Sequence, residues 1–375
     1  MPKKLVLIGG GHAHMETIAN LGNFTAKGYQ VTVIAPSEYH YYSGMGPGML
    51  GGTYKPEEIR FHTRKVVENR GGKFVLDSAV RIEPEERMVR TATDREIPYD
   101  VLSCNLGSYI EKPDIVDAPG NIFPVKPIEK LYQAHKKILS LIIEKQITIA
   151  IIGGGPSSAE IAGNINQLAE NSGGYKPKIR ILSGSAFMKR SPKKIRKMVH
   201  RTLTGRNIEI IEKGRAKLIS YNTIELGDGE KFVGDIIFLA TGVHPAEIFA
   251  ESGLPVGPDG GLLVNRFLQS EKHPEIFGGG DCIYFEEQPL DKVGVHAVRQ
   301  NPILYRNLLS ALQGSPLEEF IPNNSYLLIF NLGNGEGILH KGRLTVKGKF
   351  AFVIKDYIDR KFMRRFQAFE KEGHG

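Results

Sequence analysis

The sequence is poor in cysteine and has no long apolar run. Two cysteines in 375 residues argue against a disulfide framework, so we expect a reducing compartment, the cytoplasm. No apolar stretch approaches the roughly 20 residues that span a bilayer. The first strand is expected to begin by Leu5, which leaves no room for a signal peptide. No solenoid repeat or low-complexity tract is present, and the composition is typical of a globular protein.

Metal-ligand spacing is also lacking. His12 and His14 are two positions apart, so they point to different sides of a helix start, and no third ligand follows at a zinc-like spacing. Cys104 and Cys282 belong to no C-x-x-C or C-x4-C pair. We therefore expect no metal site, and we interpret both cysteines as small buried hydrophobic residues.

Positive charge is concentrated at one end of the chain. From residue 338 onward there are ten Lys or Arg and four Asp or Glu, a net of +6 out of +8 for the whole chain. This distribution argues against a nucleic-acid partner. Apolar residues recur there at helical spacing (Ile354, Tyr357, Ile358, Phe362, Phe366 and Phe369), and basic residues take other positions (Lys355, Arg360, Lys361, Arg364 and Arg365).

This pattern predicts a basic amphipathic helix at the C-terminal end. Two interpretations stay open for its apolar side. It could dock on a membrane surface, or it could pack on the body of the protein or on a second subunit of a homodimer.

Two glycine-rich turns, each preceded by a short apolar strand, stand out in this chain. Residues 5–8 lead into Gly9-Gly10-Gly11-His12-Ala13-His14, and residues 147–152 lead into Gly153-Gly154-Gly155-Pro156-Ser157-Ser158-Ala159-Glu160. A strand that ends in such a turn and opens a helix presents bare backbone N–H groups to a diphosphate. Two such turns predict two dinucleotides, held by one protein to pass electrons between them.

The first turn departs from the G-x-G-x-x-G pattern. His14 takes the third glycine position, and Ala35 stands where the second strand should end in an acid. Ser37 and Glu38 are nearby substitutes for holding a ribose. A plain tight turn remains the alternative interpretation.

The second turn fits better, with Ser158 at the third glycine position. Glu160 could equally be a carboxylate favoured by the helix dipole. The following strand, near residues 179–183, ends in Ser183-Gly184 without an acid. Lys189 or Arg190 could neutralise a 2′-phosphate there, or the basic run over 189–201 could be a solvated helix face. Farther on, Asp281 after Gly280 could bind a polyol such as ribitol, or cap a helix.

The remaining pattern predicts an α/β protein with two Rossmann-like dinucleotide-binding domains and a small C-terminal α+β region. We expect a discontinuous first dinucleotide-binding domain over 1–112 and 243–322, a second dinucleotide-binding domain over 113–242, and a C-terminal region over 323–375. Within these, we expect a helix over 12–22, strands over 29–34, 74–80 and 88–93, a loop-rich crossing over 113–127, and helices over 128–145 and 294–312. The tail should hold two or three strands and a terminal helix.

The motif order resembles the pyridine nucleotide–disulfide oxidoreductase superfamily, in its type II NADH dehydrogenase-like branch. The motifs are both glycine-rich turns, Tyr99-Asp100 with Gly107-Ser108, Ala240-Thr241-Gly242 and Gly280-Asp281. The chain is most similar to the flavoprotein domains found fused to selenide, water dikinase. The stretches shared with them are residues 42–45 (YSGM), 124–127 (PVKP), 297–300 (AVRQ) and 359–365 (DRKFMRR).

The resemblance implies that the domain over 1–112 and 243–322 is an FAD-binding domain and that the domain over 113–242 is an NAD(P)H-binding domain, and it implies which residues meet each cofactor. Contacts to FAD would come from Gly9, Gly11, His12, Ala13, His14, Ser37, Ser43, Gly44, Met45, Pro47, Val80, Gly107, Gly280, Asp281 and Val295. Contacts to NADH or NADPH would come from Gly153, Gly155, Pro156, Ser157, Ser158, Glu160 and Gly242, with Glu160 beside the nicotinamide as the catalytic residue.

The implied activity is an FAD-dependent NAD(P)H:acceptor oxidoreductase, with hydride passing to flavin N5 and electrons then passing to a quinone. Val295 replaces the first glutamine of the pattern that type II dehydrogenases place near quinone, while Gln300 keeps the second. A soluble acceptor in selenium or sulfur metabolism, or a flavin-bound redox sensor, are the alternatives. If the basic helix docks on a membrane, the protein would be peripheral on its inner face.

Overall fold

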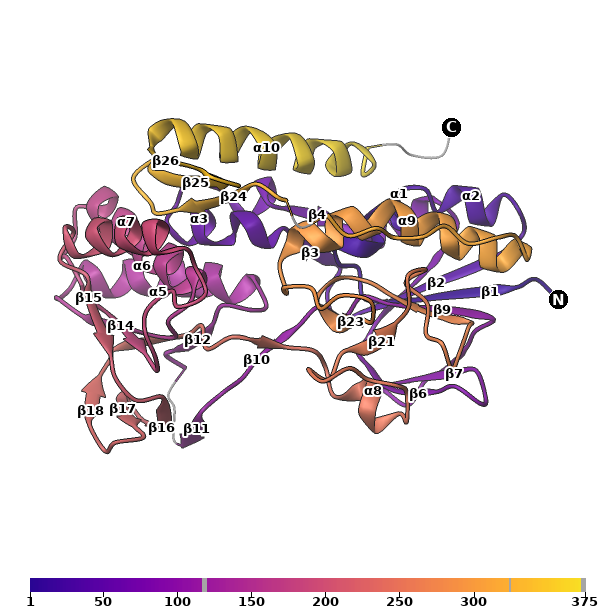
Figure 1. Ribbon diagram of the computed structural model, residues 1–375, viewed down its shortest axis with the longest axis horizontal. Helices are drawn as coiled ribbons and strands as arrows, with labels where there is room; N and C mark the ends of the chain where they lie inside the picture. The colour runs from indigo at the N-terminus through magenta and orange to yellow at the C-terminus, as the bar shows by residue number, and fades with distance from the viewer. Residues whose placement is uncertain (117–119, 324, 372–375) are drawn as a thin grey trace.

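The computed structural model describes residues 1–116, 120–323 and 325–371, and it forms two lobes, each built around a five-stranded parallel sheet (Figure 1). The first sheet has the order β22 (Ile276–Gly278), β9 (Val101–Cys104), β1 (Lys4–Ile8), β2 (Gln30–Ala35) and β5 (Lys73–Leu76). The second has the order β12 (Ile122–Pro124), β19 (Ile236–Leu239), β13 (Thr148–Ile152), β14 (Lys178–Ser183) and β15 (Glu209–Glu212).

The central strands of both sheets are buried almost throughout, as in β1 and β13. Parallel sheets are covered by helices on both faces, which is why these strands read as continuous apolar runs rather than as alternating ones. In each sheet the central strand, β1 or β13, is followed by a glycine-rich turn. Both turns therefore lie at the carboxyl edge of a sheet, where α/β folds bind ligands.

Smaller antiparallel sheets surround the two central ones. One consists of β6 (Ala79–Glu83), β7 (Met88–Thr91) and β8 (Glu96–Pro98). A second consists of β16 (Ala216–Ser220), β17 (Thr223–Leu226) and β18 (Lys231–Val233), and β11 (Asp114–Val116) pairs with β16 in parallel. The third consists of β24 (Leu328–Asn331), β25 (Gly337–Lys341) and β26 (Leu344–Gly348). Paired strands are β3 (Tyr39–Tyr41) with β4 (Arg60–His62), β10 (Tyr109–Ile110) with β20 (Val243–His244), and β21 (Leu262–Val264) with β23 (Ile283–Phe285).

Helices connect and cover these sheets. The described α-helices are α1 (Met15–Ala19), α2 (Gly22–Thr25), α3 (Gly46–Leu50), α4 (Thr63–Asn69), α5 (Glu129–Ile142), α6 (Pro156–Ser172), α7 (Lys193–Thr204), α8 (Ile248–Glu251), α9 (Gly294–Gln313) and α10 (Lys349–Ala368). Short 3-10 turns are η1 (His12–His14), η2 (Ser43–Met45), η3 (Pro56–Glu58) and η4 (Gly280–Cys282).

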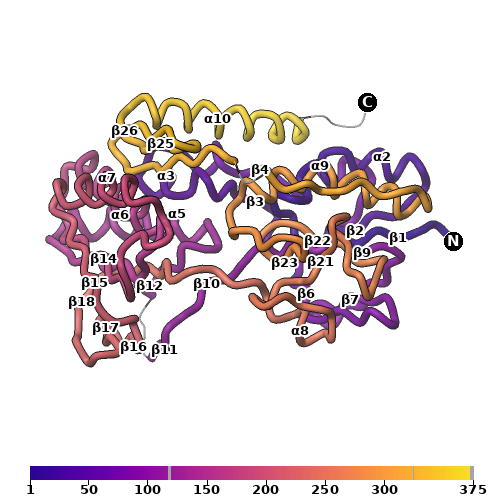
Figure 2. Tube along the Cα trace, in the orientation of Figure 1, coloured from indigo at the N-terminus to yellow at the C-terminus, as the bar shows by residue number. Residues whose placement is uncertain are grey.

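The chain passes between the two central sheets at β10 and again at β20, and these two segments pair with each other (Figure 2). Residues 117–119 of the crossing predicted over 113–127 lie outside the described residues. One core contains residues of the first sheet and of the segment from Ile248 to Phe320. The other contains the second sheet, α3 from the N-terminal segment, and part of the tail.

Several element boundaries differ from the sequence-based expectation. The strand expected over 74–80 is wrong, because the chain turns at Asp77 and Ser78 and forms β5 and β6 in two different sheets. The helix expected over 12–22 begins as the 3-10 turn η1 and ends at Ala19 as α1. The tail of three strands and a terminal helix is confirmed.

Helix α10 lies across both lobes and packs on the body of the same chain (Figure 1). Its Met363 joins the core of the second sheet, while Phe366 packs with Met15 and Phe61 of the first lobe. The predicted polarity of this helix is wrong at three residues. Lys355 is buried in an ion pair with Asp359, whereas Tyr357 and Ile358 are 65% and 43% exposed.

No helix in the described residues is both long and apolar enough to cross a bilayer. The outward face of α10 nevertheless carries large apolar side chains, which bear on the proposals below.

His14 is the residue that locks the first turn to the sheet beneath it. Its Nδ1 lies 2.6 Å from Gly9 O, and its Nε2 lies 2.8 Å from Ser103 Oγ on β9. A carbonyl oxygen can only accept, so Nδ1 carries the proton and Nε2 accepts from the hydroxyl. Burial lowers the pKa of His14 from 6.5 to about 4, against the hydrogen bond to Gly9. The ring is therefore neutral at pH 7.

We predict that His14 makes the protein acid-sensitive. Because its pKa is depressed in the folded state, the unfolded chain binds more protons between about pH 6.5 and 4, so stability falls as the pH drops through that window. The free energy of unfolding, measured with urea across pH 4–7, should rise with pH more steeply in the wild type than in His14→Gln, by up to about 1.4 kcal/mol per pH unit. The exposed His200→Gln should keep the wild-type slope; identical slopes for wild type and His14→Gln would contradict the prediction.

Candidate dinucleotide and electron-transfer site

The first glycine-rich turn is shaped by close contact with the segment after β9. Gly9 has a φ of +88°, and a Cβ there would lie 2.2 Å from Asn105 O. A Cβ on Gly11 would lie 2.9 Å from the Asn105 side chain, and one on Gly280 would lie 2.8 Å from it. Glycine is therefore required at Gly9 and favoured at Gly280, whose φ is +79°, whereas a Cβ at Gly11 would displace the Asn105 side chain; Asn105 stands between the turn and the Gly280–Asp281 segment.

Asn105 offers a hydrogen-bond donor with no partner inside the protein. Its side chain is buried, and within the described part of the chain nothing accepts from Nδ2. Such an unmade hydrogen bond costs about 1–3 kcal/mol. A polar ligand at the glycine turn would satisfy it, so the residues present fit the diphosphate and ribityl portion of FAD.

Asp281 lies in a charged cluster where the two lobes meet. Its Oδ2 accepts from Ser108 Oγ at 2.9 Å and from Lys126 Nζ at 2.8 Å. Burial opposes ionisation, but the charge and hydrogen bond of Lys126 outweigh it and hold the pKa of Asp281 below its usual range. Asp281 is therefore an acceptor at neutral pH, as binding a polyol hydroxyl requires.

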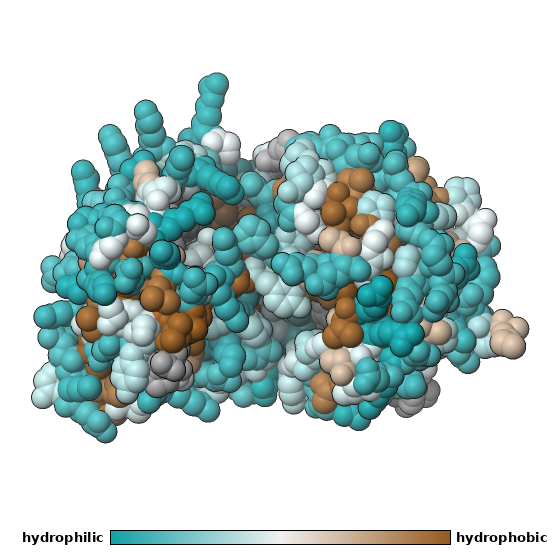
Figure 3. Space-filling view, turned by 90° about the horizontal axis from the view of Figure 1, so that it is seen from below, coloured by the Kyte–Doolittle hydropathy of each residue, from teal (hydrophilic) through white to brown (hydrophobic). Residues whose placement is uncertain are grey.

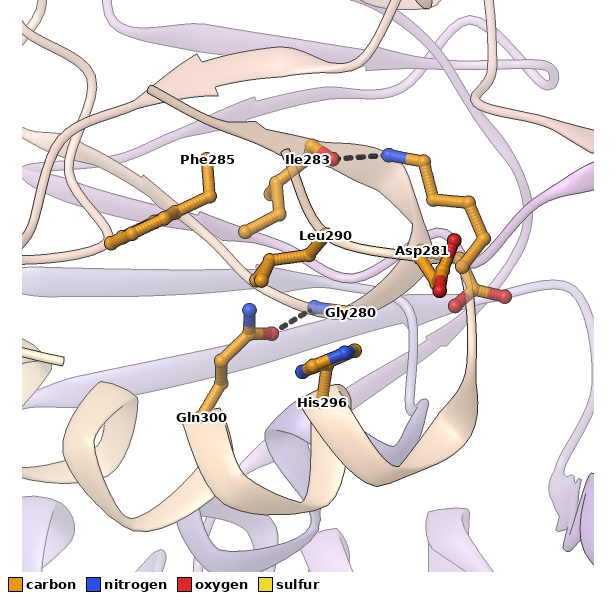
Figure 4. A pocket seen from close by; sticks show the side chains of 9 residues that line it. Gly280, Asp281, Ile283, Phe285, Leu290, His296 and Gln300 are labelled. Carbon is orange, nitrogen blue, oxygen red and sulfur yellow. Dashed lines mark hydrogen bonds between the residues drawn. The ribbon is translucent and has the colours of Figure 1, made fainter. Parts of the chain in front are cut away.

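A small hollow adjoins Asp281 at the start of α9 (Figure 4). Gln300 Oε1 accepts from Gly280 N at 2.7 Å, and the ring of His296 faces the same space with Nδ1 lacking a partner among the described residues. Val295 is in the first turn of α9, whose N–H groups have no acceptor within the helix. These free donors suit the carbonyl-rich pyrimidine end of a flavin.

The second glycine-rich turn, after β13, is also shaped by a close contact with the backbone of a neighbouring segment. Gly153 has a φ of +137°, and a Cβ there would lie 2.1 Å from Ala240 O at the end of β19. At Gly155 a Cβ would meet open space. Pro156 and Ser157 are exposed at the start of α6, whereas Ser158 is buried. Bare backbone at a helix N-terminus, open to solvent, is the geometry that receives a dinucleotide diphosphate.

Glu160 lies where α6, β24 and α10 meet. Its Oε1 accepts from Asn331 N at 2.8 Å. Removal from water raises the pKa of Glu160 to about 7, although the charge of Lys355 and the Asn331 hydrogen bond oppose this rise. The carboxyl group is therefore partly protonated at neutral pH, which distinguishes it from an ordinary surface glutamate.

Lys355 and Asp359 of α10, whose charges act on Glu160, contact the loop before α3. Lys355 Nζ donates to Asp359 Oδ2 at 2.6 Å and to Gly44 O at 2.7 Å. Asp359 Oδ1 accepts from Tyr42 Oη at 3.1 Å. We call Glu160, Lys355, Asp359 and Tyr42 the acid cluster. It brings together the nucleotide helix α6, the tail helix α10 and residues 42–45 before α3, which we call the Tyr-Gly loop.

An aromatic group borders the acid cluster. The ring of His12 lies 4.7 Å from His40, 5.2 Å from Tyr42 and 6.2 Å from Phe362, the last in a stacked arrangement. Burial, with the nearby Lys126 charge, lowers the pKa of His12 to about 4. Within the described residues, Nε2 of His12 and Nε2 of His40 have no partner. This aromatic group thus presents neutral imidazoles with unused nitrogens.

The other predicted residues lie at the expected elements with varied exposure. Met45 and Pro47 are buried, Ser43 and Gly44 are half-buried, Val80 on β6 is 48% exposed, and Gly107 and Gly242 adopt positive φ. Ser37 Oγ accepts from Tyr39 N, and Glu38 pairs with Arg64 at 2.7 Å, so both polar groups already have partners. Sequence reasoning missed Asn105, Lys355 and Asp359, whose burial no local pattern signals.

The structure also bears on the two cysteines and on metal binding. Cys104 and Cys282 are free and buried, and burial raises the pKa of Cys282 to about 11 and that of Cys104 well above its usual value. In the described ranges, no group of three His, Cys, Asp or Glu side chains is placed to hold a metal ion.

Comparison with known proteins agrees with this geometry. The model of the family described as pyridine nucleotide-disulphide oxidoreductase matches residues 3–301. The type II NADH:quinone oxidoreductase of Staphylococcus saprophyticus is 24% identical over 385 residues, covering 95% of this chain and 94% of that protein.

Two solved structures share the fold. The sulfide:quinone oxidoreductase of Aquifex aeolicus aligns with a TM-score of 0.78 at 20% identity, covering 98% of this chain and 92% of that one. NDH2 of Plasmodium falciparum, in complex with NADH, aligns with a TM-score of 0.77 at 15% identity, covering 99% and 98%. With two dinucleotide turns of fitting geometry and the match over residues 3–301, the chain belongs to the pyridine nucleotide-disulphide oxidoreductase family, as an oxidoreductase that binds FAD and uses NADH or NADPH.

Proposed function

We propose that this enzyme passes electrons from NAD(P)H to a quinone, and that the acid cluster supplies a proton for quinone reduction. The observation that carries the proposal is Glu160, a carboxyl group with a pKa of about 7 between the nucleotide helix and the tail helix. Two of the proteins that this chain resembles, from Staphylococcus saprophyticus and Aquifex aeolicus, are named for quinone as a substrate. Bound FAD would take a hydride from the nicotinamide and release its two electrons singly or together to the acceptor.

The proton balance explains why a near-neutral carboxyl group is useful here. A quinone takes up two electrons and two protons to become a quinol, whereas NAD(P)H delivers two electrons with one proton. The missing proton must come from solvent through the protein. A group with a pKa near the working pH holds a proton and gives it up readily, which is the condition for general acid catalysis.

Lys355 and Asp359 are positioning residues in this proposal. Burial raises the pKa of Glu160 most, the charge of Lys355 draws it down, and Asp359 adds a smaller rise, so the ion pair moderates the effect of burial. Tyr42 of the Tyr-Gly loop donates to Asp359, so this loop belongs to the same group of polar contacts. The aromatic group of His12, His40 and Phe362 beside it suits a flat acceptor ring, and the unused His12 Nε2 could bond a quinone carbonyl.

Thiol chemistry has no support from the two cysteines. Sulfide or dithiol oxidation at a flavin needs an accessible thiolate. Cys104 and Cys282 are buried, and burial raises the pKa of both.

The test of the electron path is an anaerobic absorbance titration of the purified protein. Addition of NADH or NADPH should bleach the flavin spectrum, and a water-soluble quinone should restore it. A flavin that bleaches and does not recover would contradict the quinone assignment, and a flavin indifferent to both nucleotides would contradict the dehydrogenase activity.

Glu160→Gln should separate proton delivery from flavin reduction. Since a general acid must be protonated, the wild-type rate with quinone should fall as the pH rises through about 7, the pKa of Glu160. Glu160→Gln should slow quinone reduction by about 100-fold and lose this pH limb. Stopped-flow flavin reduction by the nucleotide should change far less.

The matched control is Glu170→Gln on the same helix. Glu170 accepts from Asn166 and Asn334 near the far end of α6. This variant should keep the wild-type pH profile. An unchanged profile in Glu160→Gln as well would remove Glu160 from the proton path.

We also propose that the outward face of α10 rests on an anionic membrane surface, where a lipid-soluble quinone resides. Phe350, Val353 and Tyr357 are 60–70% exposed on this face, and Lys361 and Arg364 follow on the exposed side. Exposed aromatic residues beside cations are typical of interfacial helices. The opposite side of the molecule is mostly hydrophilic, with apolar residues in separate patches (Figure 3).

Replacing the outward apolar residues is a cleaner test than truncation, because deletion after Lys355 would also remove Met363 and Phe366 from the cores. Phe350→Ser/Val353→Ser/Tyr357→Ser should lose sedimentation with vesicles that contain anionic lipid, while dye reduction by NAD(P)H is kept. The control triple Ile143→Ser/Tyr221→Ser/Val233→Ser changes exposed apolar residues elsewhere and should sediment like the wild type. Full vesicle binding by the α10 variant would refute the docking.

A further inference from the structure

The strand that should select the nucleotide ends without a carboxylate. β14 ends at Ser183, the position where NAD-binding folds place an acid for the adenosine ribose. Ser183 is buried, its hydroxyl donates to Ser185 O at 2.5 Å, and a Cβ on Gly154 would lie 1.9 Å from that hydroxyl. Ser183, beside the turn, is thus small and already hydrogen-bonded, and it leaves open the space where the adenosine ribose would lie.

The nearest acid on the neighbouring strand cannot replace the missing one. Glu212 at the end of β15 is in register with Ser183. Its Oε1 accepts from Phe187 N at 2.7 Å and from Arg196 at 3.4 Å. Glu212 therefore holds the loop after β14 in place, and its charge is partly neutralised.

Basic side chains surround this strand end. Arg215 packs directly on Gly184. A Cβ added at Gly184 would lie 2.5 Å from Arg215 Cγ and 3.2 Å from Arg215 Cα. The loop then folds back onto the glycine turn through Met188 N, which donates to Gly154 O at 2.7 Å. Lys189 and Arg190 come immediately after and are exposed. No ion pair involves Arg215, Lys189 or Arg190 across the described stretches of the chain.

The structure divides the basic run over 189–201 into two parts. Lys193, Lys194 and Lys197 lie on the exposed side of α7, whose Ile195 and Val199 are buried, so that part is a solvated helix face. Lys189 and Arg190 precede the helix and belong to the loop tied to Gly154.

We propose that this enzyme selects NADPH over NADH, with Arg215, aided by Lys189 and Arg190, binding the 2′-phosphate of the adenosine ribose. A ribose phosphate carries about −1.5 to −2 charges at pH 7 and three acceptor oxygens, which arginine matches in geometry and in sign. NADH would bring a 2′-hydroxyl to a site that has no carboxylate to accept from it. The inference rests on the proposed function only in assigning this turn to the nicotinamide nucleotide.

The test measures binding of the adenosine half alone, without turnover. Calorimetric titration of the flavin-loaded protein with adenosine 2′,5′-bisphosphate and with adenosine 5′-monophosphate compares ligands that differ only in the 2′-phosphate. At low salt the bisphosphate should bind at least about tenfold tighter, and the difference should shrink as salt is raised. Equal affinity for both ligands would overturn the proposal.

Variants assign the preference to residues. Arg215→Ala should reduce the bisphosphate preference about tenfold, and adding Lys189→Ala/Arg190→Ala should abolish it. Ser185→Asp, which places an acid at an exposed position in this loop, should reverse it. Lys137→Ala removes an exposed charge from α5, which packs on β12 at the other edge of the sheet, and should leave the preference unchanged.

The outcomes separate this inference from the proposed function. If the preference persists in the triple variant, these residues do not bind the 2′-phosphate. If NADH bleaches the flavin as well as NADPH does, and quinone restores it, the nucleotide inference fails while the quinone assignment stands.

Discussion

The buried ion pair between Lys355 and Asp359 is the interaction on which the site depends. Both side chains are more than nine-tenths buried, and the ammonium also donates to Gly44 O. Removing two charges from water costs several kcal/mol each, and such a pair is tolerated only when its hydrogen bonds are complete. Here they are completed by the Tyr-Gly loop, so the tail helix and that loop hold each other in place.

A second ion pair, Lys126 with Asp281 at 2.8 Å, also joins segments that are distant along the chain. It joins the segment that enters the second lobe to the turn after β22 in the first. Lys126–Asp281 lies where the lobes meet, whereas Lys355–Asp359 ties α10 to the N-terminal loop that packs on the core of the second sheet, and neither pair is on a strand of a central sheet. The sheets therefore supply rigid edges and glycine turns, while the ionic contacts join segments that are far apart along the chain.

Local patterns were sufficient to predict the parts of the fold that are determined locally. Both glycine turns, the strands before them and the helices near 129–142 and 294–313 follow from apolar runs and from glycine positions. The inward orientation of His14 could not be predicted, because its partner Ser103 is 89 residues away. Lys355 and Asp359 look like an ordinary exposed i, i+4 pair, and only contact with Gly44 and Tyr42 makes them buried. The split of the expected strand 74–80 also depends on tertiary context, since its two halves pair with different partners.

The contact between Lys355 and Gly44 spans 311 positions of the chain. Contacts of such long sequence separation close late in folding, because the loop entropy must be lost before the contact is gained. Each lobe can bury most of its own core without this contact, but the acid cluster cannot exist until α10 has arrived. A nascent chain still emerging from the ribosome could therefore form both nucleotide turns and yet lack the carboxyl environment that tunes Glu160. Competence for proton transfer would be acquired last, in a single step that joins the two ends of the protein.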